Sequence, residues 1–454
     1  MNKYKKIKIF SYFRGYDRNT KLKKNIFASF LIKGANFFLE LFLVSLLLIY
    51  LDTFKYGIIV IMLSLVTWFT MLDFGIGQGL RNKFAEAVGK NKHRNARIYI
   101  STCYLSLGVI SIIFFCFFLI FYQFIQWSSI LTIDQSFNGE ISILSLIIFG
   151  CFSLNLILNT ISNILWADQK SGFADLILLL NKIIITISIY TLTKISSASL
   201  IYVGITYSVT PLIILVIFSI YLYNSKYKIY SPSFKFIDFK FGKKLFNVGW
   251  KFFILQTSYI ILMLTDNIII TQLYGPEAVT PYHIAGKYYS VALVLFFIVS
   301  SATRSVVTEA FTKRDFSWIK EAVNKQIKIL IGIIIFVVLM VIFSKNVFNI
   351  WVGEKIIIDY KLSIGWGLFV IVSSYSSIYI HFLNGVGKFK LQMINASIGA
   401  IINVPLSIFL AIYIGLGSTG VILATSITLL IYLILGKVQY EKIINKKAVG
   451  IWNE

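Results

Sequence analysis

The stretch IYISTCYLSLGVISIIFFCFFLIFYQF, residues 98–124, contains no charged residue. As one helix it would be about 40 Å long, which exceeds the roughly 30 Å hydrocarbon core of a bilayer. The whole chain of 454 residues has the same character: 57% is apolar, 14% is charged and the mean hydropathy is +0.80. In soluble globular proteins about half of the residues are apolar and about a quarter are charged. The composition excludes a soluble enzyme, a disordered chain and a disulfide scaffold, and it predicts an all-α polytopic membrane protein.

Long apolar stretches between polar breaks predict about 12 transmembrane helices. They cover residues 26–49, 56–72, 98–124, 141–165, 176–193, 200–222, 246–270, 282–303, 323–343, 361–383, 391–414 and 419–435. Six lie on each side of a basic segment, which we interpret as a cytoplasmic linker (223–245) between two lobes. This division predicts a cytoplasmic N-terminal segment (1–25), an N-lobe (26–222), a C-lobe (246–435) and a cytoplasmic tail (436–454).

The distribution of basic residues between the spans predicts the orientation. If the N-terminus is cytoplasmic, the loops on that side hold 32 Lys and Arg residues and the opposite loops hold four. Cytoplasmic loops of membrane proteins collect Lys and Arg, so we expect both termini in the cytoplasm. The first 25 residues are basic and polar, and we expect no signal peptide there. The net charge of +24 has the same origin, so we expect no nucleic-acid partner.

Motifs for catalysis and for metal binding are missing from the sequence. Cys103, Cys116 and Cys151 lie inside apolar stretches and form no CxxC or Cys/His spacing typical of metal ligands. There is no Walker A, GxSxG or HExxH motif, and all outer loops are short. We therefore expect no enzymatic activity, no cofactor and no metal site.

The two halves contain traces of an internal repeat. At an offset of 218 residues Lys33 aligns with Lys251, and at an offset of 223 residues Arg81 aligns with Arg304. Six helices per half is an even number, so both halves would enter the membrane from the same side. The repeats would then be parallel, related by an axis along the membrane normal.

Charged residues inside membrane spans point to functional sites, because a charge in a bilayer costs several kcal/mol and usually faces a cavity or a partner. In the first span Lys33, Asn36 and Glu40 follow one another at i, i+3 and i+7, on one helix face. They form either a cation-bearing cavity wall or a structural arrangement. In the second reading Lys33 pairs with Glu40 or extends to the inner membrane surface.

Later spans contain further charges. Lys182 lies in the fifth span, Lys251 near the inner end of the seventh and Lys287 in the eighth. Asp266, near the outer end of the seventh span, is either a proton or sodium site or a residue at the outer membrane surface. His283 lies one turn before Lys287, and a lone histidine is more often structural than catalytic.

Two spans carry stripes of uncharged polar residues. The stripes are Asn155, Asn159 and Asn163 in the fourth span, and Ser373, Ser377 and His381 in the tenth. Such stripes either hold helices together or line a water-filled cavity that suits a sugar. Together with Asn36 they are candidates for a polar cavity wall.

Several short motifs carry a resemblance to a known family. Residues 73–82 read DFGIGQGLRN and are followed by Glu86-Ala87. The other matching pieces are Lys33-Gly34, Tyr56-Gly57, Ala96-Arg97 with Tyr99-Ile100-Ser101-Thr102, Thr265-Asp266-Asn267, Tyr274-Gly275 with Val279-Thr280 and Tyr282, and Trp351-Val352-Gly353. In these pieces, which span both halves in order, the chain resembles bacterial polysaccharide repeat-unit flippases. These are the Wzx-type O-antigen transporters of the multidrug/oligosaccharidyl-lipid/polysaccharide exporter superfamily.

The resemblance implies two six-helix lobes around a central cavity in the bacterial inner membrane. It implies ion-coupled, alternating-access movement of an undecaprenyl-pyrophosphate-linked oligosaccharide for O-antigen synthesis. Membrane lipid, and the polymerase and chain-length regulator of the same pathway, are the implied partners. Alternatives are a drug exporter of the same superfamily, which the basic intramembrane balance disfavours, and a repeat-unit polymerase or ligase, which the short outer loops disfavour.

The cavity of that family is cationic, and the basic residues of this chain fit such a role, because a pyrophosphate needs a positive field. The candidate substrate-binding cations are Lys33, Lys182, Lys251, Lys287, Arg81 and Arg304. The candidates for ion coupling are Asp266 and Glu40.

Overall fold

The structure, a computed structural model, describes residues 19–453 except 70–72, 302 and 389. These residues form helices and no β-strand. The N-terminal half contains α1 (Asn19–Tyr50), α2 (Thr53–Phe69), α3 (Ile76–Gly89), α4 (His93–Tyr122), α5 (Trp127–Leu131), α6 (Asn138–Leu158), α7 (Thr160–Ala167), α8 (Ser171–Ile195) and α9 (Leu200–Asn224). The C-terminal half contains α10 (Phe239–Tyr274), α11 (Pro276–Ser301), α12 (Thr303–Thr312), α13 (Phe316–Ile342), α14 (Ser344–Val352), α15 (Tyr360–Val386), α16 (Lys390–Ile408), the π-helical turn η6 (Phe409–Tyr413) and α17 (Ser418–Ile444).

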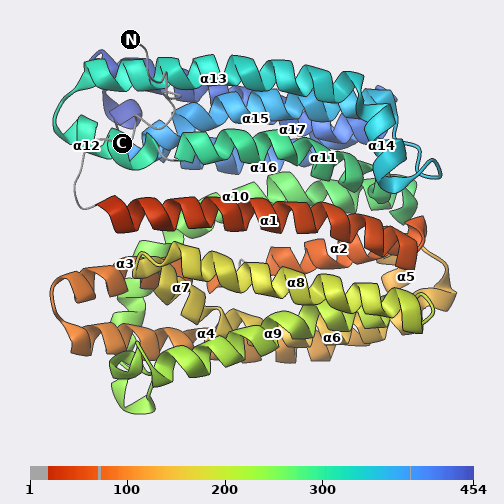
Figure 1. Ribbon diagram of the computed structural model, residues 1–454, viewed down its shortest axis with the longest axis horizontal. Helices are drawn as coiled ribbons and strands as arrows, with labels where there is room; N and C mark the ends of the chain where they lie inside the picture. Colours follow the sequence, from red (N-terminus) through yellow and green to blue (C-terminus); the bar gives the residue numbers. More distant parts are fainter. Residues whose placement is uncertain (1–18, 70–72, 302, 389, 454) are drawn as a thin grey trace, which may run out of the picture.

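The long helices run roughly along one direction, and the two halves form two layers with α1 and α10 between them (Figure 1). Helix α1 packs against α8 of its own half and also contacts α11 and α14 of the other half. Helix α10 contacts α2, α3 and α4 as well as α11, α16 and α17. We call the end of the bundle that carries α3 and α12 the basic end, and the end that carries α5 and α14 the far end.

Every predicted span falls on helical segments in the part of the chain that the structure describes, which confirms the all-α prediction, although the span 141–165 is divided between α6 and α7. Ten helices there are long and apolar enough to cross a membrane, and α2, with 17 residues, and α11 are not among them. The number of twelve crossings therefore stays a prediction. The segments that follow the second span of each half form the helices α3 and α12, so Arg81 and Arg304 occupy corresponding helices, in agreement with the proposed repeat.

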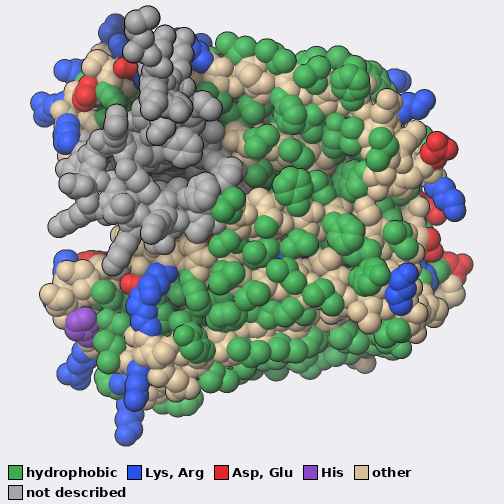
Figure 2. Space-filling model, viewed as in Figure 1, with side chains coloured by type: hydrophobic (Ala, Val, Ile, Leu, Met, Phe, Trp, Pro, Cys, Tyr) green, Lys and Arg blue, Asp and Glu red, His purple; other side chains and the backbone are tan. Residues whose placement is uncertain are grey.

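The sides of the bundle are apolar, as a surface in contact with lipid requires. Large hydrophobic side chains are exposed there, among them Ile112 and Phe117 on α4, Ile217 on α9 and Ile335 on α13. Figure 2 shows hydrophobic side chains covering the flank, whereas Lys and Arg gather at the ends. Because no soluble protein exposes so continuous an apolar surface, this distribution identifies a membrane protein.

The packing of the two halves differs between the two ends. Toward the far end, one hydrophobic core includes residues of both halves, such as Leu47, Ile59, Tyr282 and Phe369. Toward the basic end, the described residues form separate cores, one in the N-terminal half with part of α10 and two in the C-terminal half. The halves are therefore joined at the far end and separate toward the basic end.

The glycines of the motif 73–82 bring α3 into backbone contact with α10. A Cβ atom at Gly75 would lie 2.2 Å from the carbonyl oxygen of Gly249, and one at Gly79 would lie 2.2 Å from that of Leu245. Gly75 also has a φ of +74°, a left-handed conformation that glycine adopts without strain. The motif thus has a packing role, which is to seat the first turns of α10 on the N-terminal half.

The segment that connects the halves is shorter than expected and is bound to α4. Helix α9 continues to Asn224 and α10 begins at Phe239, so much of the predicted linker 223–245 is helical. Arg97 donates a hydrogen bond to the carbonyl oxygen of Ser231 over 2.8 Å, and Thr102 accepts one from the Asp238 amide over 3.1 Å. The connection therefore moves with the N-terminal half.

Replacing Gly249 with alanine should destabilise the protein, because its Cβ would lie 2.1 Å from the carbonyl oxygen of Gly75. Since backbone is on both sides, we expect a cost of about 2 kcal/mol or more, visible as a lower melting temperature in detergent. Gly332→Ala on α13 is the matched control, because its Cβ would have no neighbour within 4 Å. Equal melting temperatures for the two variants would contradict the proposed contact.

Candidate functional site

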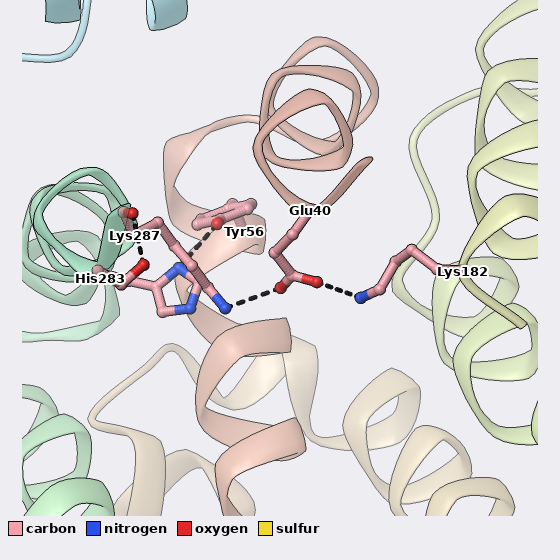
Figure 3. Close-up of polar contacts among 6 residues, drawn as sticks. Glu40, Tyr56, Lys182, His283 and Lys287 are labelled. Atoms are coloured by element: carbon pink, nitrogen blue, oxygen red, sulfur yellow. Dashed lines mark hydrogen bonds and ion pairs between the residues drawn. The ribbon is translucent and has the colours of Figure 1, made fainter. Parts of the chain in front are cut away.

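A single carboxylate joins the two halves of the molecule. Glu40 lies on α1, and its Oε1 is 2.7 Å from the Nζ of Lys287 on α11. Its Oε2 forms an ion pair with Lys182 on α8. Figure 3 shows the carboxylate between the two ammonium groups, which approach from opposite sides. One lysine belongs to each half, so Glu40 bridges them.

The three side chains are half-buried, with 28% of Glu40, 21% of Lys182 and 29% of Lys287 exposed. Two lysines this close would repel each other in a low-dielectric setting, and the shared carboxylate compensates that repulsion. The group still carries one net positive charge. It therefore has the charge and the partial access that an anion-binding site needs.

Helices α2 and α11 meet beside this site. The Tyr56 hydroxyl and the Nδ1 of His283 are 2.8 Å apart, and His283 lies one turn before Lys287 on α11 (Figure 3). The Thr280 hydroxyl donates to the carbonyl oxygen of Thr53 over 2.7 Å. These bonds hold the two halves together between the ion pairs and the far end.

Helix α14 adds a second contact at the far end. The Trp351 indole donates to the carbonyl oxygen of Leu41 over 3.0 Å, and the Ser45 hydroxyl donates to that of Trp351 over 3.1 Å. Leu41 and Ser45 both follow Glu40 on α1, so they lie farther from the basic end than Glu40 does. The charged group is thus covered on the far side, and it lies between these contacts and the basic end.

The alternative in which Lys33 pairs with Glu40 is wrong. The Lys33 Nζ lies 3.9 Å from the Oδ2 of Asp175 on α8, and Glu40 pairs with the two other lysines. The helix face was identified correctly, but the helices that pack against it supply different partners. Lys33 is 53% exposed and Asn36 is half-buried, so both remain candidates for a cavity lining.

Arg81 lies on α3 and is held by the N-terminal half. Its Nε donates to the Oδ1 of Asn163 over 2.9 Å, and its guanidinium lies 3.8 Å from the ring centre of Trp166. These contacts orient the side chain, and its role toward a substrate stays a prediction. The side chains of Lys251 and Arg304 lie outside the described residues.

The structure separates the members of the polar stripes. Asn163 is buried and binds Arg81, whereas Asn155 is half-buried and Asn159 is exposed. In α15, Ser377 donates to the carbonyl oxygen of Ser374, and the ring of His381 lies 5.5 Å from that of Phe297. Ser373 is half-buried. A cavity wall built from these residues therefore stays a prediction.

Asp266 lies in a second polar cluster, inside the C-terminal half. Its side chain is 2% exposed, and its Oδ2 accepts from the hydroxyls of Tyr282 on α11 (2.6 Å) and Thr425 on α17 (3.4 Å). Asn403 on α16 donates to Thr425 over 3.0 Å. The surrounding helices bury the carboxylate, so it is not exposed on the surface of the protein, and its position near the outer membrane surface stays a prediction.

The salt bridges between described residues include none to Asp266. Its Oδ1 and the Oδ1 of Asn403 also lack a hydrogen-bond partner there. An ionised carboxylate without a cation is costly to bury, so the site has to bind a proton or a cation to be neutral. Of the two candidates for ion coupling, Asp266 therefore fits better than Glu40, whose charge is already compensated.

Some residues of these clusters were missed from the sequence. Tyr56 and Tyr282 lie in short motifs, but nothing in the pattern assigned them to His283 and Asp266. Asn403 lies alone within an apolar span, a signal that could have been used. Thr425 has no distinguishing signal, because threonine is ordinary in a membrane helix.

Two layers of membrane-length helices, joined at one end over a charged group, are the architecture of a membrane transporter. The chain is similar in fold to a solved inward-facing structure of a multidrug resistance MATE family transporter of the MOP superfamily. The TM-score is 0.74 at 15% identity, over 91% of this chain and 95% of that chain.

Residues 22–307 match the family described as polysaccharide biosynthesis protein, and the chain belongs to that family. Residues 253–409 also match the MatE family. The chain is similar to an O-antigen export protein of Yersinia pseudotuberculosis, at 21% identity over 81% of this chain and 84% of the relative. It is likewise similar to an O-antigen transporter of Salmonella typhimurium, at 22% identity over 79% of this chain and 82% of the relative.

Tyr56→Phe should lower the stability of the contact between α2 and α11, because His283 would lose its hydrogen-bond partner in a half-buried place. We expect a loss of about 1 kcal/mol, measured as a shift of the melting temperature in detergent. Tyr221→Phe is the control, because this side chain on α9 is 61% exposed. An unchanged melting temperature for Tyr56→Phe would mean that the bond contributes nothing.

Proposed function

We propose that this protein flips lipid-linked oligosaccharide repeat units from the inner to the outer leaflet of the bacterial cytoplasmic membrane. The observation that carries the proposal is membership of the polysaccharide biosynthesis family, with O-antigen export relatives matched over about four fifths of the chain. The polyprenyl diphosphate of such a substrate is a multiply charged anion. The two lysines bound by Glu40 supply cations from both halves for it.

The proposed cycle uses alternating access between two lobes, residues 26–222 and 246–435. The arrangement described here, joined at the far end, is the one that would accept a substrate from the basic end. We propose that the basic end faces the cytoplasm and that both termini lie there, because its loops carry most of the Lys and Arg. No chemical step is needed, since the repeat unit crosses unchanged and is then available to a polymerase and its chain-length regulator.

We further propose that Asp266 couples the cycle to an ion gradient. Its burial between α10, α11 and α17, without an ion pair among the described residues, supports this role. All three helices belong to the C-terminal half, so the ion site is separate from the lysines that span both halves.

Deletion of the gene in its native host should cause lipid-linked single repeat units to accumulate and surface polysaccharide to disappear. The reason is that units made at the inner leaflet cannot reach the outer leaflet for polymerisation. Both quantities are measured together, by extraction of polyprenyl-linked saccharides and by electrophoresis of surface polymer. The wild-type gene on a plasmid should restore both, and the empty plasmid is the control.

Two results would contradict this function. Unchanged surface polymer would favour a drug exporter, which the MatE match at residues 253–409 makes the next candidate. Repeat units that reach the outer leaflet but stay unpolymerised would favour a polymerase or ligase.

Asp266→Asn should remove ion-dependent stabilisation, because an amide needs no counter-charge. If the coupling ion is sodium, the purified wild-type protein should melt at a higher temperature in sodium chloride than in choline chloride. If it is a proton, the protein should melt at a higher temperature at pH 6 than at pH 8. A ligand at a hundredfold excess over its Kd adds about 2.7 kcal/mol to the free energy of unfolding.

Asp52→Asn is the control for this measurement, because Asp52 is exposed and bonds only the nearby Lys55 amide. It should keep the ion dependence of the wild type. Ion-dependent melting that persists in Asp266→Asn would assign the coupling ion to another residue.

A further inference from the structure

We propose that Glu40 is an internal competitor for the substrate's diphosphate, and that it makes the site selective against the singly charged phosphodiesters of membrane lipids. This inference rests on the proposed function, because it assigns Lys182 and Lys287 to the diphosphate of a lipid-linked saccharide. It adds a specificity-determining role for an acidic residue inside a cationic site.

The geometry of the carboxylate supports this role. Each of its oxygens faces one ammonium group, Oε1 toward Lys287 and Oε2 toward Lys182 (Figure 3). Phosphate groups also present neighbouring anionic oxygens and form the same kind of charge-assisted bonds with lysine. The two lysines are therefore already arranged around an anion, and that anion is part of the protein.

The second support is that the hydrogen bonds and ion pairs of the carboxylate among the described residues are those to the two lysines. Glu40 is also 28% exposed. The separate cores at the basic end leave this group on the side from which a substrate would enter. The carboxylate can rotate about its side-chain bonds and leave the lysines in place.

Because Glu40 is part of the chain, its carboxylate is always close to the two lysines and competes at a high local concentration. An incoming anion has to displace the carboxylate from the lysines. Its apparent affinity is therefore its intrinsic affinity multiplied by the small fraction of molecules in which the carboxylate has left. A phosphodiester carries one negative charge, as the carboxylate does, and gains little by the exchange. The diphosphate of a lipid-linked saccharide is esterified at both ends, carries two negative charges and satisfies both lysines better. Because a membrane contains far more phosphodiester lipid than carrier lipid, this difference excludes the commoner anion.

The same exchange bears on the movement of the halves. Without substrate, Glu40 links α1 and α8 to α11 and thus keeps the halves joined beside the far end. When a diphosphate replaces the carboxylate, the link between the lysines passes through the substrate. The empty protein and the loaded protein then differ in what connects the halves, which is a condition for coupling movement to binding.

Glu40→Gln tests this directly, because the amide keeps the shape of the side chain and loses its charge. Binding of farnesyl diphosphate, a short soluble polyprenyl diphosphate, is measured by calorimetry on the purified full-length protein in detergent, with phosphatidylglycerol as the competing phosphodiester. We expect Glu40→Gln to bind farnesyl diphosphate at least about tenfold more tightly than the wild type. We also expect phosphatidylglycerol to compete in the variant and not in the wild type.

Glu140→Gln is the matched control, because Glu140 on α6 bonds the backbone amide of Leu200 and not a lysine. It should bind both lipids as the wild type does. Lys182→Ala and Lys287→Ala, each combined with Glu40→Gln, should reverse the gain in affinity.

Glu40→Asp is the second variant, in case Glu40→Gln does not fold. Its shorter carboxylate spans the two lysines poorly and should give an intermediate affinity.

Affinity that stays equal or falls in Glu40→Gln and Glu40→Asp would overturn the proposal, since a purely structural ion pair gives that result. The outcome is separable from the test of the proposed function. If the deletion strain kept its surface polymer while Glu40→Gln bound farnesyl diphosphate more tightly, the competitor role would stand and the flippase function would fail. If the deletion strain accumulated repeat units while the affinity of Glu40→Gln for farnesyl diphosphate did not rise, the flippase function would stand and the competitor role would fail.

Discussion

The sharing of one carboxylate by two lysines from different halves is the interaction on which the site depends. Inside a membrane a charge needs a partner, and here one acid compensates two bases while the group stays positive. The consequence is a link among α1, α8 and α11 that joins the two halves through charged side chains. The hydrogen bond between Tyr56 and His283 and the contacts of Trp351 with α1 extend this link to the far end.

The contacts between the two halves differ between the two ends of the bundle. At the far end, the halves share one hydrophobic core and are joined by polar bonds, so separating them exposes apolar surface. Toward the basic end, the described residues form separate cores, one of which combines the N-terminal half with the start of α10. The backbone contact of α3 with α10 ties the start of the second half to the first. Such an asymmetry is what an alternating-access transporter needs in the state that accepts its cargo.

Two acids inside the helix bundle, Glu40 and Asp266, have opposite surroundings, which argues for different tasks. Glu40 is compensated by lysines and stands where an anionic substrate would bind. Asp266 has hydroxyl partners and no ion pair among the described residues, and it lies wholly within the C-terminal half. We therefore propose that the first acts on the substrate and the second on the coupling ion. Helix α11 contributes Lys287 to one cluster and Tyr282 to the other, and thus connects them.

By itself the sequence determined the membrane class and the positions of the long helices, and it predicted the division into halves. These follow from local properties: an apolar run long enough to cross a bilayer forms a helix wherever the chain continues. It also marked Lys182, Lys287, Glu40 and Asp266, because charge in an apolar span is conspicuous. Only the tertiary structure decided the partners. Lys182 and Lys287 are 142 and 247 residues from Glu40 along the chain, and no periodicity within one helix specifies which neighbour packs against it. The expected pairing of Lys33 with Glu40 failed for that reason: it used the spacing within α1, whereas α8 and α11 supply the actual contacts.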